Sequence, residues 1–486
     1  MADSIKKQMT VGIFFTAIAK YSNVFISLIV TAILARILSP EEFGIVAIAT
    51  VIIVFFNMLT EIGIGPAIVQ NKELNKDDLS DIFSFTIWFG LILTIIFVLL
   101  AKPIAIYYET PILEPISYYL SIAIFFNSSQ IVPNALIYKD KDFKFIALRS
   151  FSIQLFAGII AVVSVFLGFG IYALLINPIL SSILLFIISY IKKPIKFKLN
   201  LASNSFKKIL SFSTYQFLFN FVNYFTLNID KLLIGKFLNL DAIGYYEKSY
   251  RLMMLPLQTI TFIVSPVMHP IFSDLQYNYK KLSDSYLKVV KLLAYIGFPL
   301  SVFLFFTAKE LVFLIFGLQW EKSILSFQIL SFSVGIQIIL STSGSIFQAT
   351  NSTKILFISG LISTVLNIIS ILIGVFYYKS IEAVSFFLLI SFIINFFQAF
   401  LLMYLTVLKL PIFDFFKALI NPILLSIFIW VALFCLDLIL QIDILLISLI
   451  YKLFVCLIVM FIYNYFFKLI DLKYYIKYLF EQVFKS

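Results

Sequence analysis

The chain has 486 residues, of which 62% are hydrophobic and only 13% are charged. Soluble proteins carry roughly 25% charged residues, so this composition excludes an ordinary soluble enzyme and indicates a membrane protein. The formal net charge is +11. Apolar runs of about 20 residues, without the alternation of a membrane barrel, predict an all-α polytopic fold of transmembrane helices.

Fourteen transmembrane helices are predicted from apolar runs that end at charged residues, at proline, or at asparagine and glycine. In chain order they cover residues 10–37, 43–69, 79–101, 115–137, 146–168, 171–191, 207–234, 243–270, 285–307, 323–349, 355–377, 381–407, 414–437 and 444–467. The loops between them are short, and no phosphate-binding loop motif occurs. We therefore expect no enzyme active site, no cofactor and no nucleic-acid partner.

The distribution of Lys and Arg predicts the orientation of these helices. Of the 36 Lys and Arg residues, 25 fall on the side of the two termini, seven on the opposite side and four within spans. Because positive charge accumulates in cytoplasmic loops, both termini are predicted to be cytoplasmic. The opposite side is called the outer side below.

Cysteine and histidine are too rare to build a metal site. Cys435 and Cys456 both lie in apolar runs, and His269 is the single histidine. Neither a disulfide framework nor a metal site is therefore expected.

An internal repeat relates the first two spans to the seventh and eighth. ARILSPEEFGIV, which starts at Ala35, aligns without a gap with GKFLNLDAIGYY, which starts at Gly235. The offset of 200 residues also brings Pro66 opposite Pro266. The alignment pairs identical or similar residues: Arg36 with Lys236, Leu38 with Leu238, Glu41 with Asp241 and Gly44 with Gly244.

The repeat predicts the organisation of the whole chain. Because 200 residues cover six spans, an even number, the two copies should be parallel, as in several transporters built from two lobes. We predict an N-terminal lobe at 1–200, a C-terminal lobe at 201–408, two further helices at 409–467 and a cytoplasmic amphipathic tail at 468–486.

Three stretches of the sequence carry a family resemblance. They are LARILSPEEFGIVAIA from Leu34, GIGPAIVQ from Gly63, and NIDKLLIGKFLNLDAIGYYEKSYRLMMLP from Asn228. Together with the plan of six, six and two helices, they resemble the Wzx-type polysaccharide and O-antigen flippases. These belong to the MATE-like multidrug/oligosaccharidyl-lipid/polysaccharide superfamily.

The resemblance implies a function in the synthesis of a surface polysaccharide such as O-antigen or capsule. A protein of this type would move undecaprenyl-pyrophosphate-linked oligosaccharide units across a bacterial cytoplasmic membrane by alternating access, driven by H+ or Na+. Membrane lipid would surround it, and a polymerase and a chain-length regulator would be further partners.

Cations inside the spans, or near the ends of spans, are the predicted substrate-binding residues. A pyrophosphate group needs a hydrated, cationic path, because moving its charge through hydrocarbon is prohibitive. The alternative is that each cation extends to the lipid head groups or forms a structural ion pair. The candidates are Lys20, Arg149, Lys231 and Arg251.

Acids in or near the spans are the predicted ion-coupling residues. A buried carboxylate with a raised pKa could bind H+ or Na+ and release it when a cation approaches. The candidates are Glu61, Asp230 and Glu247. Static salt bridges are the alternative, for instance between Glu247 and Arg251, four residues apart on a helix.

Proline and glycine inside two spans are the predicted gating residues. Proline removes a backbone donor and glycine relaxes a helical turn, so both favour a kink that could act as a gate or could be fixed. The candidates are Gly63, Gly65 and Pro66 in the second span, and Pro256 and Pro266 in the eighth.

Three other functions fit parts of this pattern. A drug or cation antiporter of the same superfamily would need an acidic cavity, whereas the charges within these spans are mainly cationic. A peptidoglycan-precursor flippase shares the helical plan, and only the local stretches argue against it. A membrane-embedded glycan ligase or polymerase would carry a long outer loop, which this sequence lacks.

Overall fold

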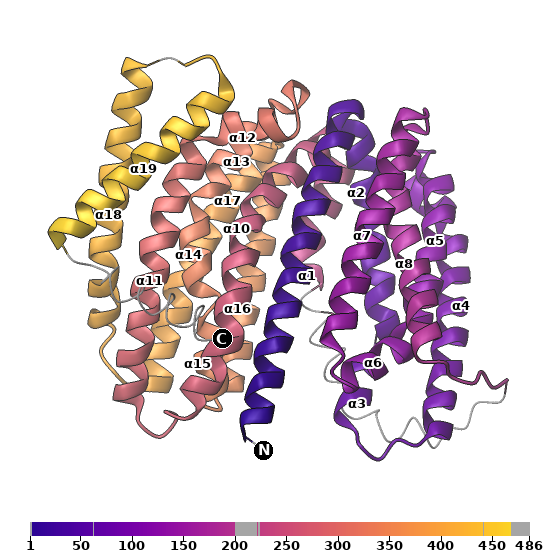
Figure 1. Cartoon of the computed structure of the whole chain (residues 1–486). Coiled ribbons are helices and arrows are strands. Elements are labelled where there is room, and N and C mark those ends of the chain that lie inside the picture. Colours follow the sequence, from indigo (N-terminus) through magenta and orange to yellow (C-terminus); the bar gives the residue numbers. More distant parts are fainter. Residues whose placement is uncertain (1, 62, 200–220, 222–223, 441, 468–486) are drawn as a thin grey trace. The chain divides into compact units, whose positions relative to one another are not determined.

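The computed structural model describes residues 2–61, 63–199, 221, 224–440 and 442–467 (Figure 1). Every regular element in these residues is a helix. The predicted all-α polytopic fold is therefore confirmed. The chain forms two compact units, Met1–Glu247 and Lys248–Ser486, which are described separately.

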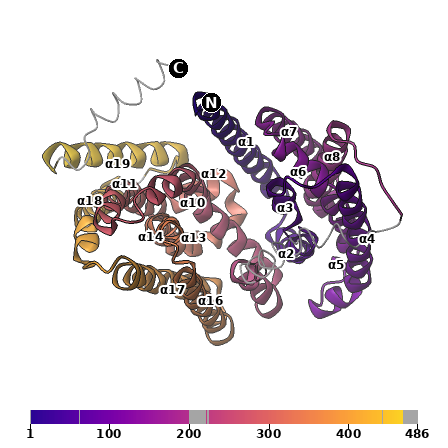
Figure 2. The same cartoon turned by 90° about the horizontal axis from the view of Figure 1, so that it is seen from below.

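The first unit is a bundle in which long helices run side by side. The helix α1 packs along α7, α4 packs along α5, and α8 contacts both α5 and α7 (Figures 1 and 2). Residues 224–237 are also helical, and α10 (Leu240–Ser273) begins in this unit. The other helices are α1 (Ala2–Ile37), α2 (Pro40–Glu61), α3 (Ile64–Gln70), α4 (Lys76–Tyr107), α5 (Leu113–Ser129), α6 (Ile131–Lys139), α7 (Phe143–Phe166), η1 (Gly170–Tyr172) and α8 (Ala173–Lys192).

The described residues of the second unit form the rest of α10 and nine further α-helices. Here α11 contacts α14 and α18, α17 contacts α13, α14 and α16, and α19 packs on α18. The elements are α11 (Tyr279–Phe306), α12 (Ala308–Ile315), η2 (Leu318–Trp320), α13 (Ser323–Ser331), α14 (Ser333–Leu340), α15 (Ser343–Ala349), α16 (Thr353–Leu372), η3 (Ile373–Tyr378), α17 (Ile381–Leu402), η4 (Met403–Leu408), α18 (Phe413–Ile439) and α19 (Leu445–Phe467).

Ten helices of the described residues are long and apolar enough to cross a membrane, or twelve if two bent pairs each count as one span. The seventh predicted span, 207–234, lies largely outside the described residues, and the eighth, 243–270, falls within α10. The count of fourteen therefore stays a prediction, as do the lobe boundaries. The predicted tail at 468–486 lies outside the described residues.

The side chains are distributed as a lipid environment requires. Large apolar residues such as Leu99, Phe166 and Phe454 are more than half exposed, and a surface this apolar is stable in lipid rather than in water. Small residues pack between helices instead. For example, a Cβ atom on Gly335 of α14 would lie 2.8 Å from the carbonyl carbon of Gly297 on α11. Helix packing in these units therefore relies on close backbone approach.

The second predicted span, where a kink is expected, is divided between two helices, α2 and α3. The helix breaks between α2 and α3, where Gly63 has a φ of 72°, a left-handed conformation that glycine adopts without steric cost. Pro66 lies in the first turn of α3, where its missing N–H leaves no helical bond unmade. By contrast, α10 is one continuous helix from Leu240 to Ser273, so it is not interrupted at Pro256 or Pro266.

Candidate functional site

The two copies of the repeat have the same backbone geometry. Helix α1 ends at residue 37 and the helix before α10 ends at residue 237, while α2 and α10 begin at Pro40 and Leu240. The N–H of Leu38 donates to Leu34 O at 2.9 Å, and 200 residues later that of Leu238 donates to Ile234 O at 3.0 Å. The offset found in the sequence therefore extends to the hydrogen bonds of the turn.

Both helix starts are also capped in the same way. Ser39 Oγ accepts a hydrogen bond from the N–H of Glu42 at 3.2 Å, and the Glu42 carboxylate accepts one from Ser39 N–H at 2.8 Å. In the second copy Asn239 Oδ1 accepts from Ala242 N–H at 2.6 Å. These caps satisfy amide groups that a helix start leaves without partners, so both copies fix where their helices begin.

The two helix starts pack on each other reciprocally. A Cβ atom on Gly44 would lie 1.9 Å from the carbonyl oxygen of Leu240, and one on Gly244 would lie 2.1 Å from that of Pro40. Real Cβ atoms do not approach so closely, so only glycine fits at either position. Each glycine therefore packs directly against the backbone of the first residue of the helix in the other copy.

An ion pair lies beside this contact, on the predicted outer side. Lys236 Nζ is 2.8 Å from Glu109 Oε1 and 5.0 Å from the ring centroid of Tyr107. The hydrogen bond from Lys236, followed by its charge, lowers the pKa of the Glu109 carboxyl below its ordinary value. The pair joins the end of α4 to the turn that precedes α10.

A polar cavity of about 340 Å³ opens at the same place. Its lining comes from the first turn of α2, from the residues that follow α4, and from residues 235–241, which join the end of the helix at 224–237 to the start of α10, all within the first unit. It consists of Glu41, Tyr108, Glu109, Thr110, Gly235, Lys236, Asn239, Leu240 and Asp241.

Asp230 and Lys231 are the predicted site residues that the structure brings together with a further polar side chain. Asp230 is buried, and its carboxylate accepts hydrogen bonds from the Tyr246 hydroxyl at 2.7 Å and from the Lys231 N–H at 2.8 Å. Tyr246, on the first turns of α10, was not foreseen. The contact links the helix before the turn to the helix after it.

Arg149 is buried and holds three helices together. Its Nη1 donates to Ser189 Oγ at 2.7 Å and its Nη2 to Asn134 Oδ1 at 2.9 Å, which ties α7 to α8 and α6. Both partners are neutral, and Nε has no hydrogen-bond partner among the described residues. This positive charge therefore lacks a carboxylate at ion-pair distance in the described part of the chain.

The remaining predicted residues lie on different helices. Lys20 is half-buried on α1, and Glu61 is exposed as the last residue of α2, two residues before Gly63. Glu247 and Arg251 are half-buried on α10, on either side of the boundary between the two units. Their roles stay predictions.

A buried ion pair in the second unit was not foreseen. Lys452 Nζ on α19 lies 2.8 Å from Glu310 Oε1 on α12 and 3.2 Å from Asp437 Oδ1 on α18. The Ser448 hydroxyl donates to the same Glu310 oxygen at 2.6 Å. Because 142 residues separate Lys452 from Glu310, no spacing in the sequence could indicate the pair.

Lys248 is predicted to lie inside the eighth span, but its aromatic neighbours were not foreseen. Lys248, on α10, lies with its Nζ 5.5 Å from the ring centroid of Trp320 and 6.0 Å from that of Phe316. Aromatic faces attract cations, which makes burial of this charge less costly. The sequence places Lys248 beside Glu247 and three residues before Arg251, and nothing in this spacing indicates that Phe316 and Trp320 lie next to it.

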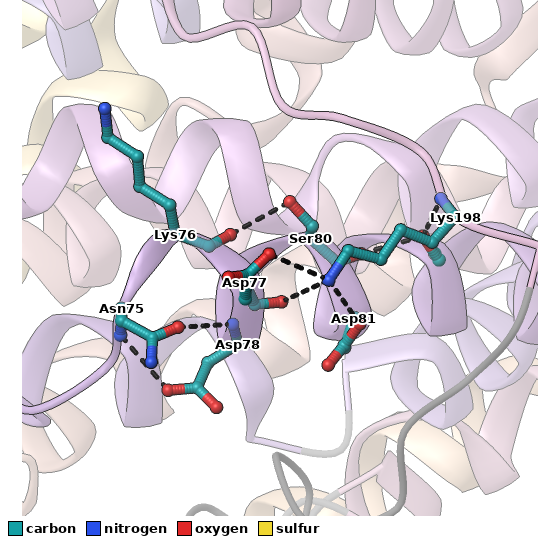
Figure 3. Close-up of polar contacts among 8 residues, drawn as sticks. Asn75, Lys76, Asp77, Asp78, Ser80, Asp81 and Lys198 are labelled. Carbon is teal, nitrogen blue, oxygen red and sulfur yellow. Dashed lines mark hydrogen bonds and ion pairs between the residues drawn. The ribbon is translucent and has the colours of Figure 1, made fainter.

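On the predicted cytoplasmic side, the segment after α8 is fastened to the start of α4. Figure 3 shows the Lys198 side chain reaching the carboxylates of Asp77 at 3.1 Å and Asp81 at 3.0 Å. Its backbone N–H donates to Ser84 Oγ at 2.8 Å. The hydrogen bonds to Asp81 and then Asp77 raise the pKa of Lys198 above its ordinary value, so the amine stays charged at physiological pH.

These features define a polytopic helical membrane protein in which one turn between helices occurs twice, 200 residues apart. A family model described as "Polysaccharide biosynthesis protein" matches residues 33–325. This is more than half of the chain, and the chain belongs to that family. The resemblance drawn from the three sequence stretches is thereby confirmed at the level of the family.

Curated relatives with similar sequences carry related names. The chain is 26% identical over 364 residues to the "Teichuronic acid biosynthesis protein TuaB" of Bacillus subtilis, covering 73% of this chain and 74% of that protein. It is 25% identical over 378 residues to the "Lipopolysaccharide biosynthesis protein WzxC" of Escherichia coli, covering 76% of each chain.

Solved structures share the fold. The chain superposes on the lipid II flippase MurJ in an inward closed conformation with a TM-score of 0.76 at 19% identity, covering 94% of this chain and 99% of that one. It superposes on an inward-facing multidrug transporter of the MATE family with a TM-score of 0.63 at 16% identity, covering 80% and 95%. The MATE-like fold expected from the sequence is thus confirmed.

Proposed function

We propose that this protein is a flippase that moves undecaprenyl-pyrophosphate-linked oligosaccharide units across a bacterial cytoplasmic membrane for surface polysaccharide synthesis. The observation that carries the proposal is the extent of the family match, because residues 33–325 include both copies of the repeat and the reciprocal contact between them. The names of the relatives and the fold of MurJ support the same class of substrate. Both termini are proposed to be cytoplasmic.

The crossed helix starts are proposed to form the outer gate of this flippase. Gly44 and Gly244 allow direct backbone contact, and the Lys236–Glu109 pair reinforces it at the rim. The Glu109 side chain of this pair is exposed, and ion pairs at the surface contribute little to stability. Breaking the pair when the gate opens therefore costs little free energy. The break at Gly63 provides a second place where the chain can bend, in line with the gating role proposed for Gly63, Gly65 and Pro66.

The substrate and ion sites are proposed from the charges within the membrane. Lys20 and Arg251 contact the pyrophosphate, while Arg149 and Lys231 add positive potential without leaving their present neighbours. Glu61, Asp230 and Glu247 are the candidates for binding H+ or Na+. Glu61 is the most accessible of the three, so it is the first to test.

Depletion of the protein tests the proposed function. Lipid-linked oligosaccharide should accumulate on the cytoplasmic face of the membrane, and surface polysaccharide should fall in proportion. The accumulated lipid can be extracted and its sugars identified by mass spectrometry. Unchanged surface polysaccharide without accumulation would contradict the proposal.

A peptidoglycan-precursor flippase is the second candidate, because MurJ shares the fold over 94% of this chain. The same depletion separates the two functions. Accumulated lipid that carries a peptide would favour the second candidate, whereas a peptide-free oligosaccharide favours the first.

A further inference from the structure

The cavity beside the crossed helix starts has the size of a small ligand site. Ligand pockets generally measure about 300–1,000 Å³, and this one, at about 340 Å³, lies at the lower end. It would admit a short sugar segment rather than a whole oligosaccharide with its lipid carrier. Its walls are the two copies of the repeated turn and the end of α4.

Several polar groups of the lining are available to a ligand. The carboxylates of Glu41 and Asp241, which occupy equivalent positions in the repeat, make no hydrogen bond or ion pair with any described residue. Asn239 uses its Oδ1 to cap α10, which leaves its amide N–H groups as donors. The two carboxylates can accept hydrogen bonds from the hydroxyl groups of a ligand, and the Asn239 amide can donate one to a neighbouring hydroxyl oxygen.

The charge of the lining selects among hydroxylated ligands. Glu41, Glu109 and Asp241 outnumber the single cation, Lys236, so the cavity is acidic although the whole chain carries +11. A phosphate or a uronic acid would be repelled, whereas an amino group would be attracted. Metal binding is a poorer fit, because no group of three or more His, Cys, Asp or Glu among the described residues could hold an ion.

We propose that this cavity is a subsite for uncharged or amino-bearing sugar residues on the outer side of the protein, and that it rejects sugars carrying carboxylate or phosphate. The inference rests on the proposed function, since a flippase presents an oligosaccharide to this side of the membrane. The carrier pyrophosphate and the sugar then have separate sites of opposite charge within one chain. Residues Glu41, Asn239 and Asp241 make the hydrogen bonds to the sugar.

Binding of short sugars to the full chain in lipid nanodiscs tests the subsite. Three disaccharides serve as probes: cellobiose is neutral, chitobiose from glucosamine is cationic, and digalacturonic acid is anionic. Saturation-transfer difference NMR, with titration of each probe, should give binding of chitobiose and cellobiose and none of digalacturonic acid. The double variant Glu41→Gln with Asp241→Asn should weaken chitobiose binding about tenfold or more.

The matched control is Asp443→Asn, an exposed acid between α18 and α19 that is also predicted to be on the outer side. It should leave binding unchanged. Equal binding of all three disaccharides, or undiminished binding in the double variant, would overturn the subsite. Binding of chitobiose alone, abolished by salt, would indicate a simple cation site and would overturn it as well.

The outcome for the subsite is separable from that for the flippase. If depletion of the protein causes lipid-linked oligosaccharide to accumulate but none of the disaccharides binds, the flippase proposal stands and the subsite is wrong. If the sugars bind in the expected order while depletion causes no accumulation, the subsite stands and the flippase proposal fails.

Discussion

Gly44 and Gly244 are the residues whose replacement the structure tolerates least. A methyl group on either would overlap a backbone carbonyl oxygen at about 2 Å, and a backbone cannot yield as a flexible side chain does. Gly44→Ala or Gly244→Ala should therefore separate the helix starts and abolish transport, measured as the loss of surface polysaccharide in a depleted strain. Amide exchange at residues 38–44 and 238–244 should rise at the same time.

Gly360 of α16 provides the matched control for this prediction. A Cβ atom there meets nothing within 4 Å, and its place inside α16 allows a side chain. Gly360→Ala should therefore keep most of the activity. Equal loss of transport in Gly44→Ala and Gly360→Ala would show that the reciprocal contact is not the cause.

Arg251 is the cation whose removal distinguishes substrate binding from structure. Because it is proposed to contact the pyrophosphate, Arg251→Ala should abolish translocation while abundance in the membrane stays normal, and Arg251→Lys should restore part of it. Lipid-linked oligosaccharide on each face of the membrane is the measurement. Normal transport by Arg251→Ala would make the residue structural.

At the scale of the helices, the end of α4 and the turn before α10 should separate in acid. The pKa of Glu109 is lowered by Lys236, so the pair contributes stability above the ordinary carboxyl pKa and loses it as the pH falls through the lowered value. The protection factors of the amides at residues 107–110, in which each exchange rate is corrected for its intrinsic pH dependence, should therefore stay constant from neutral pH to about pH 5 and fall only below that. Glu109→Gln should remove this dependence, and a fall in protection already near neutral pH would contradict it.

The helix α19 should depend on its buried ion pair. Breaking such a pair by removing one partner leaves an unpaired charge and costs roughly 3–5 kcal/mol. Lys452→Met should therefore lower the thermal stability of the purified protein, whereas the double change of Lys452→Met with Glu310→Leu should restore much of it. Equal destabilisation by the single and double variants would mean that packing, not charge, holds α19 to α12.

Two helix bends show which local signals the sequence analysis missed. Helices α5 and α6 meet at 41°, and Pro133 explains the break because its ring excludes the carbonyl four residues earlier. Helix α13 meets the segment Ser333–Ala349, which comprises α14 and α15, at 47°. At this bend the hydroxyls of Ser331 and Ser333 donate back to carbonyls of the preceding turn. Pro133 could have been recognised in the sequence as a site of a helix break. A serine, in contrast, indicates a bend only when its hydroxyl is known to bond a carbonyl of the preceding turn.

For the whole molecule, hydrophobic runs and the repeat were sufficient to predict the fold class. Membrane helices must satisfy their own backbones, so apolar length alone indicates them. The charged partners could not be predicted, because Lys452 and Glu310 come from distant parts of the chain and Arg149 has neutral partners. The repeat predicted that Gly44 and Gly244 are equivalent, but not that each packs on the other copy.

The equivalence of the two turns gives this protein an internal reference for experiment. Leu38 and Gly44 each have a counterpart 200 residues later, with the same backbone hydrogen bond in one case and a reciprocal close contact in the other. If both copies of the turn have the same function, equivalent substitutions such as Gly44→Ala and Gly244→Ala should reduce transport equally. A difference within a pair would measure how far the two copies of the turn differ in function, independently of any related protein.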